Sequence, residues 1–254
     1  MSIAHAWGYR IAERVAGRFR DATIVLSPQE ADAALRAHVA KPSTIHIIPN
    51  GVSQSAHDRI AARNELVRAG VPEDALVIGC VANFYPVKNI PGLVKAFLKI
   101  KNDRIDTHLV LIGDGEDRPV MEKTTASSAR IHLLGFRPDA RALLDGCDLF
   151  VLPSHKEGFP FALLEAMEAA LPCLATRVGG IPNIIDDGKN GWLTTPETLS
   201  DDLGRVLTLR SSWNAVGHAA QKTIHDRFEE TRMQRETLRV YEELTKKISR
   251  PDRS

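Results

Sequence analysis

Short apolar segments alternate with helical patterns along most of the 254-residue chain, and this alternation restricts the fold more than any other feature. The apolar segments are nearly continuous in Val, Ile and Leu, which is typical of strands buried on both faces of a parallel sheet. We expect strands over 22–27, 43–52, 76–84, 108–115, 130–136, 148–154, 172–180 and 191–195, helices over 28–38, 57–70, 89–100, 139–147 and 160–170, and two or three polar helices at the end. The sequence therefore predicts an α/β protein with a doubly wound parallel sheet and right-handed crossovers.

The composition indicates a globular protein with a sizeable core. Hydrophobic residues make up 43% and charged residues 26% of the chain, and the net charge of +1 gives no reason to expect a nucleic-acid partner. Cys80, Cys147 and Cys173 lie in or beside apolar segments without CxxC spacing, so we expect buried, reduced thiols. No apolar run reaches the roughly 18 residues of a membrane span, and the first residues lack a signal-peptide core. These features predict a cytoplasmic protein.

Polar and glycine residues gather at the predicted ends of the strands. Ligands of open parallel sheets bind beyond the carboxyl ends of the strands. The residues at these ends are Asn83, Lys88, Gly113, Asp114, Gly115, Phe136, Arg137, Ser154, His155, Glu157, Gly179 and Gly180. Because parallel strands end at one edge of a sheet, these residues predict a single ligand site there.

The stretch HKEGFPFALLE, residues 155–165, leaves a strand and enters a helix. Gly158 permits close approach of a ligand, and Phe159 follows it in the turn. Pro160 suits the first helical position, because its missing N–H would be unpaired there. The free N–H groups of Phe161 and its successors then form an anion site suited to a phosphate or pyrophosphate.

Two carboxylates flank this turn. Glu157 precedes the helix and Glu165 lies roughly one turn inside it, so a ligand along the helix start could touch both. Carboxylates accept hydrogen bonds from vicinal hydroxyls, such as those of a ribose or a hexose. Lys88 could supply a point charge to a phosphate. Taken singly, these residues also fit a surface loop and an ordinary solvated helix, and that alternative stays open on the residues alone.

Several common site signatures are absent from the sequence. The segment IGDG, residues 112–115, is not a GxGxxG fingerprint, because Arg118 occupies the third glycine position, and this disfavours a dinucleotide oxidoreductase. No GxxxxGK[ST] motif supports a P-loop nucleotidase. No HExxH motif or His/Cys cluster indicates a built-in metal. A nucleotide or sugar-phosphate site of another kind remains.

The assembled motifs resemble the nucleotide-sugar-binding half of retaining glycosyltransferases of the GT-B fold, family 4 (group 1 glycosyltransferases). The most specific element is the E-x7-E signature from Glu157 to Glu165. The family's other segments follow in the expected order: IPNGV at 48–52, VKN at 87–89, LIGDGE at 111–116, LLGFRPD at 133–139 and VGGIP at 178–182. The resemblance covers roughly residues 20–240.

The resemblance implies a role for each matching residue. Glu157 and Lys88 would be catalytic, with Glu157 holding donor-sugar hydroxyls and Lys88 the diphosphate, while Glu165 would hold the ribose. The other donor-binding residues would be Asn83, Gly113, Asp114, Gly115, Phe136, Arg137, Ser154, Gly158, Phe159, Pro160, Phe161, Gly179 and Gly180, with Phe136 and Arg137 against the base. Transfer would retain anomeric configuration by a front-face route, without a cofactor or metal.

Two residues depart from the family pattern. Asn83 stands where the family usually has an arginine, so one diphosphate cation is absent. Asn183 stands where many relatives have a glutamate, and it can still hydrogen-bond.

The resemblance also implies a domain organisation. Residues 1–52 would be a remnant of the N-terminal acceptor domain, 53–235 the nucleotide-sugar-binding domain and 236–254 a C-terminal helix and tail, so that the chain resembles an N-terminally truncated enzyme. His5 lies in a segment faintly like the one carrying the family's base, although an ordinary terminal residue is the favoured interpretation. Arg10, Arg14 and Arg18 lie at helical spacing opposite Ile11, Val15 and Phe19, and here a solvated helix face is favoured over membrane contact.

The expected function is the donor half of a retaining glycosyltransferase. It would transfer a sugar from a nucleotide-diphosphate sugar to a glycan or lipid-linked acceptor in polysaccharide, glycolipid or glycoconjugate synthesis. The alternative is a non-catalytic or partner-dependent nucleotide-sugar-binding module. A partner chain supplying the first half, or a second copy of this chain, fits either hypothesis, and a lipid-linked acceptor would bring the protein to the inner membrane surface.

Overall fold

The computed structural model describes residues 12–100, 105–126 and 128–248, in which two parallel sheets are present. The larger has six strands in the order β5-β4-β3-β6-β7-β8, and the smaller pairs β1 with β2. The strands are β1 Thr23–Val25, β2 Ile45–Ile47, β3 Leu76–Val81, β4 Thr107–Ile112, β5 Ile131–Gly135, β6 Leu149–Leu152, β7 Cys173–Thr176 and β8 Trp192–Thr194. The α/β prediction with a parallel sheet is confirmed.

The helices follow the predicted alternation with one addition. They are α2 Pro28–Arg36, α3 Arg59–Arg68, α4 Ile90–Leu98, α5 Arg118–Thr125, α6 Ala140–Leu144, α7 Phe161–Glu168, α8 Leu199–Thr208, α9 Trp213–Arg227 and α10 Glu230–Ile248, and residues 12–17 are also helical. The sequence did not predict α5. Only Met121 and Thr125 of this helix are buried, so its apolar pattern is weak.

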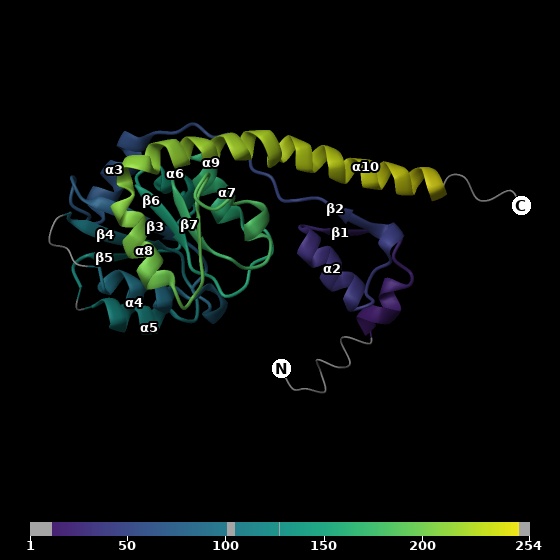
Figure 1. Cartoon of the computed structure of the whole chain (residues 1–254), viewed down its shortest axis with the longest axis horizontal. Coiled ribbons are helices and arrows are strands. Elements are labelled where there is room, and N and C mark those ends of the chain that lie inside the picture. Colours follow the sequence, from purple (N-terminus) through teal and green to yellow (C-terminus); the bar gives the residue numbers. More distant parts are fainter. Residues whose placement is uncertain (1–11, 101–104, 127, 249–254) are drawn as a thin grey trace, which may run out of the picture.

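Successive residues of the central strands pack into two separate cores, one on each face of the six-stranded sheet. On β3, Val77 joins the core formed with α3, α6, α7 and part of α9, whereas Leu76 and Ile78 join the core formed with α4, α5 and α8. Burial on both faces explains why the strands read as continuous apolar segments. Figure 1 shows the sheet between its helices, with the unit of β1, β2 and α2 to one side.

All three cysteines are buried and free, as predicted. Burial raises the pKa of Cys80 and of Cys147 to about 12, and burial also raises the pKa of Cys173. These thiols are part of the core, because the thiolate form is strongly disfavoured there.

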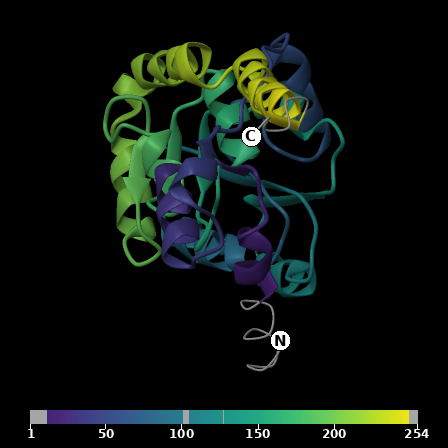
Figure 2. The same ribbon diagram turned by 90° about the vertical axis from the view of Figure 1, so that its right-hand side faces the viewer.

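The segment after β2 links the small unit to the six-stranded sheet and to α10. Val52 N donates to Phe228 O at 2.9 Å, and Glu230 N donates to Val52 O at 3.1 Å. In Figure 2, which looks from the side of the small unit, α10 points toward the viewer above that unit. α10 is continuous across residue 235, and the division of the chain at residues 52 and 235 stays a prediction.

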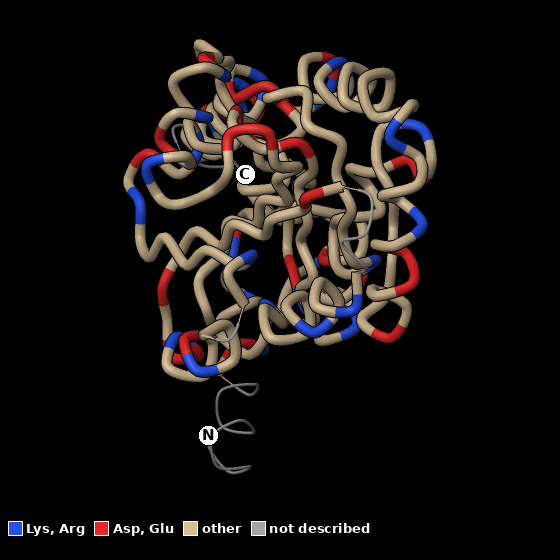
Figure 3. Tube along the Cα trace, turned by 90° about the vertical axis from the view of Figure 1, so that its left-hand side faces the viewer, with Lys and Arg blue, Asp and Glu red and all other residues tan. Residues whose placement is uncertain are grey.

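The N-terminal amphipathic pattern is only partly described. His5, Arg10 and Ile11 lie outside the described residues. Val15 is 49% and Phe19 81% exposed. Among the described helices, none combines the length and apolar character needed to cross a bilayer. Along the trace in Figure 3, basic and acidic residues are interspersed, in line with the small net charge.

Candidate functional site

The centre of the six-stranded sheet contains a switch in strand order. From β3 the chain proceeds through β4 to β5 on one side, and from β6 through β7 to β8 on the other, although β3 and β6 are neighbours. The connections that leave β3 and β6 therefore diverge, and ligands of open parallel sheets bind beyond the carboxyl ends of the strands at such a point. The loops that follow these two strands carry Lys88 and Glu157.

Lys88 and Glu157 form a direct ion pair at this switch point. Lys88 Nζ lies 2.8 Å from Glu157 Oε1 and 2.9 Å from Oε2, and Ser154 Oγ donates to Oε1 at 2.6 Å. The Glu157 side chain is 6% exposed and the Lys88 side chain 25%. The interpretation of Glu157 as a surface-loop residue is therefore wrong, because its carboxylate is buried and held by two donors.

Backbone and side-chain hydrogen bonds join the two loops. His155 N donates to Val87 O at 2.8 Å, and Asn89 Nδ2 donates to Pro153 O at 3.1 Å. Asn89 adopts a left-handed conformation with φ of 53°, which ends the short 3-10 turn Pro86–Lys88. The turn carrying Lys88 is thus fixed directly against the loop carrying Glu157.

The glycines predicted to admit a ligand are required by the protein's own backbone. Gly179 has φ of +52°, and a Cβ there would lie 1.8 Å from Glu157 O. A Cβ on Gly113 would lie 1.8 Å from Ala82 O, and one on Gly115 2.5 Å from Phe84 O. Gly180 N donates to Gly158 O at 2.8 Å. Close loop packing around the crevice explains these glycines, and their contact with a ligand stays a prediction.

The start of α7 presents unpaired amides, as the sequence predicts. The first backbone bond onto the corner runs from Leu164 N to Pro160 O at 3.3 Å. Among the described residues, the amides of Phe161, Ala162 and Leu163 have no acceptor. Pro160 is the N-cap rather than the first helical residue, a shift of one position that keeps these amides free, and their binding of an anion stays a prediction.

Glu165 lies in the first turns of α7 with a half-buried carboxylate. Burial raises the pKa of Glu165, the charge of Arg141 on α6 opposes this, and the charge of Glu168 adds to it. Within the part of the chain that the structure describes, the Glu165 carboxylate makes no hydrogen bond. Its oxygens are therefore available to hydroxyl donors of a ligand.

Two predicted donor-binding side chains do not face the crevice. Ser154 has no exposed surface, and its hydroxyl holds Glu157. Phe159 is 3% exposed, and its ring packs edge-on against Phe228 at 5.2 Å between centroids. The Ser154 hydroxyl is bonded to the Glu157 carboxylate, and the Phe159 ring is packed in the core. Only the backbone of these two residues could therefore contact a ligand.

The residues after β4 and β5 form a more open part of the edge. Phe136 is 72% exposed, and Arg137 is paired with Asp139 through bonds of 2.8 and 2.6 Å. Asp114 accepts from Gly115 N at 2.8 Å, and Asn83 is exposed. Among the described residues no hydrogen bond joins this group to Glu157 or Lys88, so the structure places these residues at the same edge without bringing them into contact with the pair.

Sequence reasoning gave no role to two residues that contact the site. Asn50 Nδ2 donates to Phe159 O at 2.7 Å, and Glu30 lies beside Gly158. Asn50 lies in the segment IPNGV of the family pattern, and this segment was the one sequence feature that could have pointed to a role for Asn50. At the departure Asn183, the buried Oδ1 has no hydrogen-bond partner among the described residues, although Arg227 binds its backbone oxygen at 2.9 Å.

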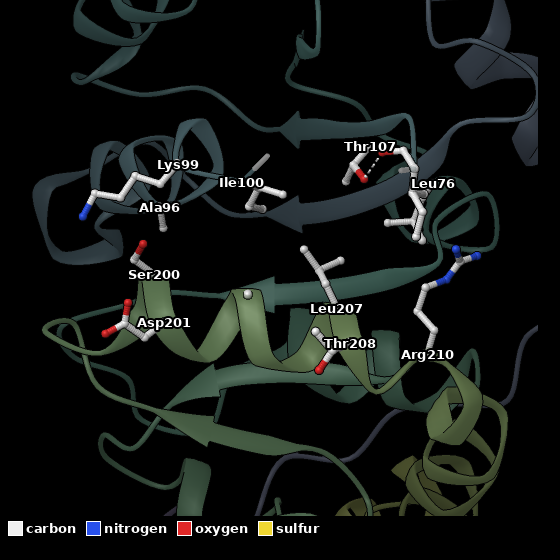
Figure 4. Close-up of a pocket in the computed structure, with 12 residues that line it drawn as sticks. Leu76, Ala96, Lys99, Ile100, Thr107, Ser200, Asp201, Leu207, Thr208 and Arg210 are labelled. Carbon is white, nitrogen blue, oxygen red and sulfur yellow. Dashed lines mark hydrogen bonds between the residues drawn. The ribbon is translucent and has the colours of Figure 1, made fainter. Parts of the chain in front are cut away.

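A groove of ≈ 950 Å³ lies elsewhere, at the amino ends of the strands between α4 and α8. Its lining is mainly apolar, from Leu76, Ala96, Ile100 and Leu207, with Lys99 and Asp201 at the rim (Figure 4). None of the predicted site residues lines it. The described residues also contain no cluster of three His, Cys, Asp or Glu side chains that could hold a metal ion.

A doubly wound parallel sheet with a cation, a buried carboxylate and free helical amides at its switch point defines a Rossmann-like protein of the nucleotide- or sugar-phosphate-binding kind. The family described as "Glycosyl transferases group 1" matches residues 75–209. The chain belongs to this family, which confirms the resemblance seen in the sequence.

Curated relatives are similar over much of this chain. N-acetyl-alpha-D-glucosaminyl L-malate synthase of Bacillus anthracis is 30% identical over 191 residues, which cover 73% of this chain and 49% of the relative. UDP-Gal:alpha-D-GlcNAc-diphosphoundecaprenol alpha-1,3-galactosyltransferase of Escherichia coli is 28% identical, covering 73% of this chain and 50% of the relative. The chain spans about half the length of these curated relatives.

Solved structures confirm the GT-B type of fold. Sucrose-phosphate synthase from Thermosynechococcus elongatus has a TM-score of 0.80 at 23% identity, covering 93% of this chain and 61% of that one. The Anabaena protein Alr3699/HepE, crystallised in complex with UDP-glucose, has a TM-score of 0.79 at 24% identity, covering 93% of this chain and 67% of that one.

Proposed function

We propose that this chain binds a nucleotide-diphosphate sugar at the sheet's switch point and acts as the donor half of a retaining glycosyltransferase. The observation that carries the proposal is that the Lys88–Glu157 pair lies in the loop that leads directly to the free amides of residues 161–163. A nucleotide sugar offers the matching groups, since a diphosphate lies between two polyhydroxyl rings. An acceptor-only carboxylate suits each ring, and positive charge suits the diphosphate.

Each group has a defined task in this proposal. Glu157 accepts hydrogen bonds from donor-sugar hydroxyls, and Glu165 accepts them from the ribose. Lys88 and the α7 amides bind the diphosphate and stabilise the charge that develops on it as the bond between the sugar and the phosphate oxygen breaks. The acceptor hydroxyl attacks the anomeric carbon from the face that the diphosphate leaves and gives its proton to the departing phosphate oxygen, so configuration is retained. These groups supply the stabilisation without a metal ion.

The remaining predicted residues complete the donor site. Asn83, Gly113, Asp114, Gly115, Gly179 and Gly180 line it through their loops, and Phe136 and Arg137 lie against the base. The exposed ring of Phe136 supports this role, because an exposed aromatic can stack on a nucleobase.

The relatives suggest which substrates to try first. The Escherichia coli relative is named for UDP-Gal and a diphosphoundecaprenol-linked acceptor, and the Anabaena structure contains UDP-glucose. UDP-hexoses are therefore the first donors, and glycans or lipid-linked saccharides the first acceptors. We infer a cytoplasmic location, from which a lipid-linked acceptor would bring the protein to the inner membrane surface.

A second function has one observation in its favour. Asn83 cannot supply the cation that the family usually has at this position. A nucleotide-sugar-binding module that depends on a partner chain for catalysis would tolerate this loss. Hydrolysis or transfer of donor by the purified chain alone would exclude this alternative.

Calorimetric titration tests the leading proposal. UDP, GDP, ADP, UDP-glucose, UDP-galactose and UDP-N-acetylglucosamine are titrated into the wild type, Glu165→Ala and the control Glu242→Ala on the exposed face of α10. We expect one base to be preferred, a loss of roughly 1–3 kcal/mol for Glu165→Ala, and no change for Glu242→Ala. A wild type that binds none of these nucleotides rejects the proposal.

A further inference from the structure

The corner that leads into α7 is held by a residue from outside the six-stranded sheet. Asn50, in the segment after β2, donates from Nδ2 to Phe159 O at 2.7 Å across 109 residues of sequence. A carbonyl oxygen can only accept, so the amide nitrogen of Asn50 must be the atom facing it. Among the described residues, Asn50 is the one hydrogen-bond donor to this oxygen.

Three consecutive carbonyl groups of the corner are bound to the protein. Gly158 O accepts from Gly180 N at 2.8 Å, Phe159 O accepts from Asn50, and Pro160 O accepts from Leu164 N at 3.3 Å. The amides of Phe161, Ala162 and Leu163 have no acceptor within the described chain. The corner therefore separates its two kinds of polar group, with the oxygens bound inward and the N–H groups left for a ligand.

The peptide between Phe159 and Pro160 differs chemically from its neighbours. Proline has no N–H, so this peptide carries an oxygen and no donor. If the peptide rotated toward the helix start, it would place the negative end of its dipole beside a bound phosphate and offer no compensating hydrogen bond. Fixing this one carbonyl consequently matters more for an anion than fixing the carbonyls on either side.

The small unit also restrains the preceding residue. A Cβ on Gly158 would lie 2.9 Å from Glu30 Oε1 and 3.6 Å from Leu26 Cδ1. Glu30 is itself fixed, since its Oε2 accepts from Leu26 N at 2.9 Å. Two neighbouring residues of the corner are thus in contact with the small unit, and Asn50 supplies the hydrogen bond.

We propose that Asn50 is a positioning residue for the diphosphate of the donor. Its amide holds the Phe159 carbonyl away from the start of α7, so that this carbonyl does not face the anion there. This inference rests on the proposed function, because it assigns Asn50 a part in the same site. It concerns the diphosphate only, so binding of the nucleoside part is independent of Asn50.

The test compares ligands with and without the diphosphate. UDP is titrated by calorimetry, and uridine by saturation-transfer NMR, into the wild type, Asn50→Ala, Asn50→Asp and the exposed control Asn64→Ala on α3. If the wild type prefers another base, that base's diphosphate and nucleoside are used. We expect Asn50→Ala to weaken UDP binding about tenfold, the effect of one well-made hydrogen bond, and to change uridine binding less than about twofold.

Asn50→Asp keeps the side-chain shape, and its ionised carboxylate cannot donate and repels the carbonyl. We expect a larger loss of UDP affinity than for the alanine variant, again with uridine binding retained. Melting temperatures are recorded for every variant, and if Asn50→Ala does not fold, the same comparison is made with the isosteric Asn50→Asp.

The outcomes separate this inference from the proposed function. If the wild type binds no nucleotide, both fall together. If the wild type binds UDP and the Asn50 variants bind it equally well, the positioning role is wrong and the proposed function stands. Equal losses for UDP and uridine would also overturn the inference, since Asn50 would then act on the fold in general.

Discussion

At the scale of single residues, the ion pair at the switch point is the main determinant of the site. The Glu157 side chain is 6% exposed, and two donors, Lys88 and Ser154, hold its carboxylate. Removing one partner of a buried pair leaves a charge without compensation, so the pair fixes the positions of both side chains. In the proposed function, a bound diphosphate would compete with Glu157 for Lys88.

This competition predicts opposite effects for two ligands in the variant Glu157→Gln. UDP affinity should stay equal or rise by up to about tenfold, because Lys88 loses its carboxylate partner. The added affinity of a UDP-sugar over UDP should fall, because the ionised acceptor for sugar hydroxyls is gone. Calorimetry with both ligands measures the difference, and Lys95→Ala on the exposed side of α4 serves as the control. Equal losses for both ligands would contradict this account of the pair.

A second prediction at this scale concerns the stability of the variant Gly179→Ala. With φ of +52° and Glu157 O at 1.8 Å from an added Cβ, the variant Gly179→Ala must displace the backbone of Glu157. We expect the free energy of unfolding to fall by about 1–3 kcal/mol or more. We also expect nucleotide binding to be lost.

The control for Gly179 is Gly204→Ala in α8, where nothing lies within 4 Å of an added Cβ. This change should stabilise the protein by about 0.5–1 kcal/mol, because alanine favours the helix. Thermal melting of both variants measures the contrast. A Gly179→Ala protein that melts like the wild type would show that the loop yields easily.

At the scale of secondary-structure elements, a buried ionic cluster joins the segment after β2 to α6 and α7. His57 Nδ1 lies 2.8 Å from Asp145 Oδ1, and its Nε2 lies 3.2 Å from Glu168 Oε1. Glu168 also accepts from Arg141 Nη2 at 3.0 Å and from Ser55 Oγ at 2.9 Å. Both carboxylates only accept hydrogen bonds, so the imidazolium form, with two N–H groups, satisfies both.

The pKa of His57 follows from these contacts. Burial alone lowers it, but the hydrogen bond and charge of Asp145 and the charge of Glu168 outweigh burial, so the pKa is raised above its ordinary value of 6.5. A raised pKa in the folded state means that His57 stabilises the protein fully below the unfolded value and progressively less as the pH rises through the folded value.

The matching prediction compares the wild type with His57→Gln. The wild type should melt at a higher temperature at pH 5.5, and this advantage should shrink as the pH approaches 9. The control is His218→Gln, because the exposed His218 ring bonds to the backbone oxygen of Asn214 on its own helix and to no carboxylate among the described residues. An advantage of constant size across this range would rule out the imidazolium assignment.

At the scale of the whole molecule, the segment after β2 meets the corner between β6 and α7. Asn50 reaches Phe159, and two residues later Val52 pairs with Phe228 and Glu230 at the start of α10. The segment that leaves the small sheet therefore contacts the donor corner and the last helix in succession. Breaking or forming the Asn50–Phe159 bond would therefore couple the position of the small unit to the proposed donor site.

The rate at which the buried thiols react with a reagent reports on opening of the whole molecule. Cys80, Cys147 and Cys173 are fully buried, and with burial raising the pKa of Cys80 and Cys147 to about 12 the reactive thiolate is scarce. Reaction with a thiol-specific chromogenic disulfide at pH 8 should be slow in the native protein, and all three thiols should react on addition of denaturant. Rapid labelling of any thiol under native conditions would show local opening of the sheet.

Several features of this protein were predictable because their signals are local. The strand positions follow from apolar segments, although every predicted range runs past the carboxyl end of its strand, for example 172–180 against Cys173–Thr176. The residues between the observed and the predicted ends of these strands belong to the loops that carry the candidate site. The sequence did not reveal α5, because only Met121 and Thr125 of this helix are buried and one buried turn gives little periodicity.

The amino-acid sequence by itself determined the α/β class, the family and the set of candidate residues, because periodicity and motif order are properties of neighbouring positions. Only the tertiary structure decided which of these residues meet. Lys88 binds Glu157 across 69 residues and Asn50 binds Phe159 across 109, and Ser154 and Phe159 turn into the core instead of the crevice. The physical reason is that strand order and loop packing select the partners of a charge or a carbonyl, and neither is encoded in any short stretch of chain.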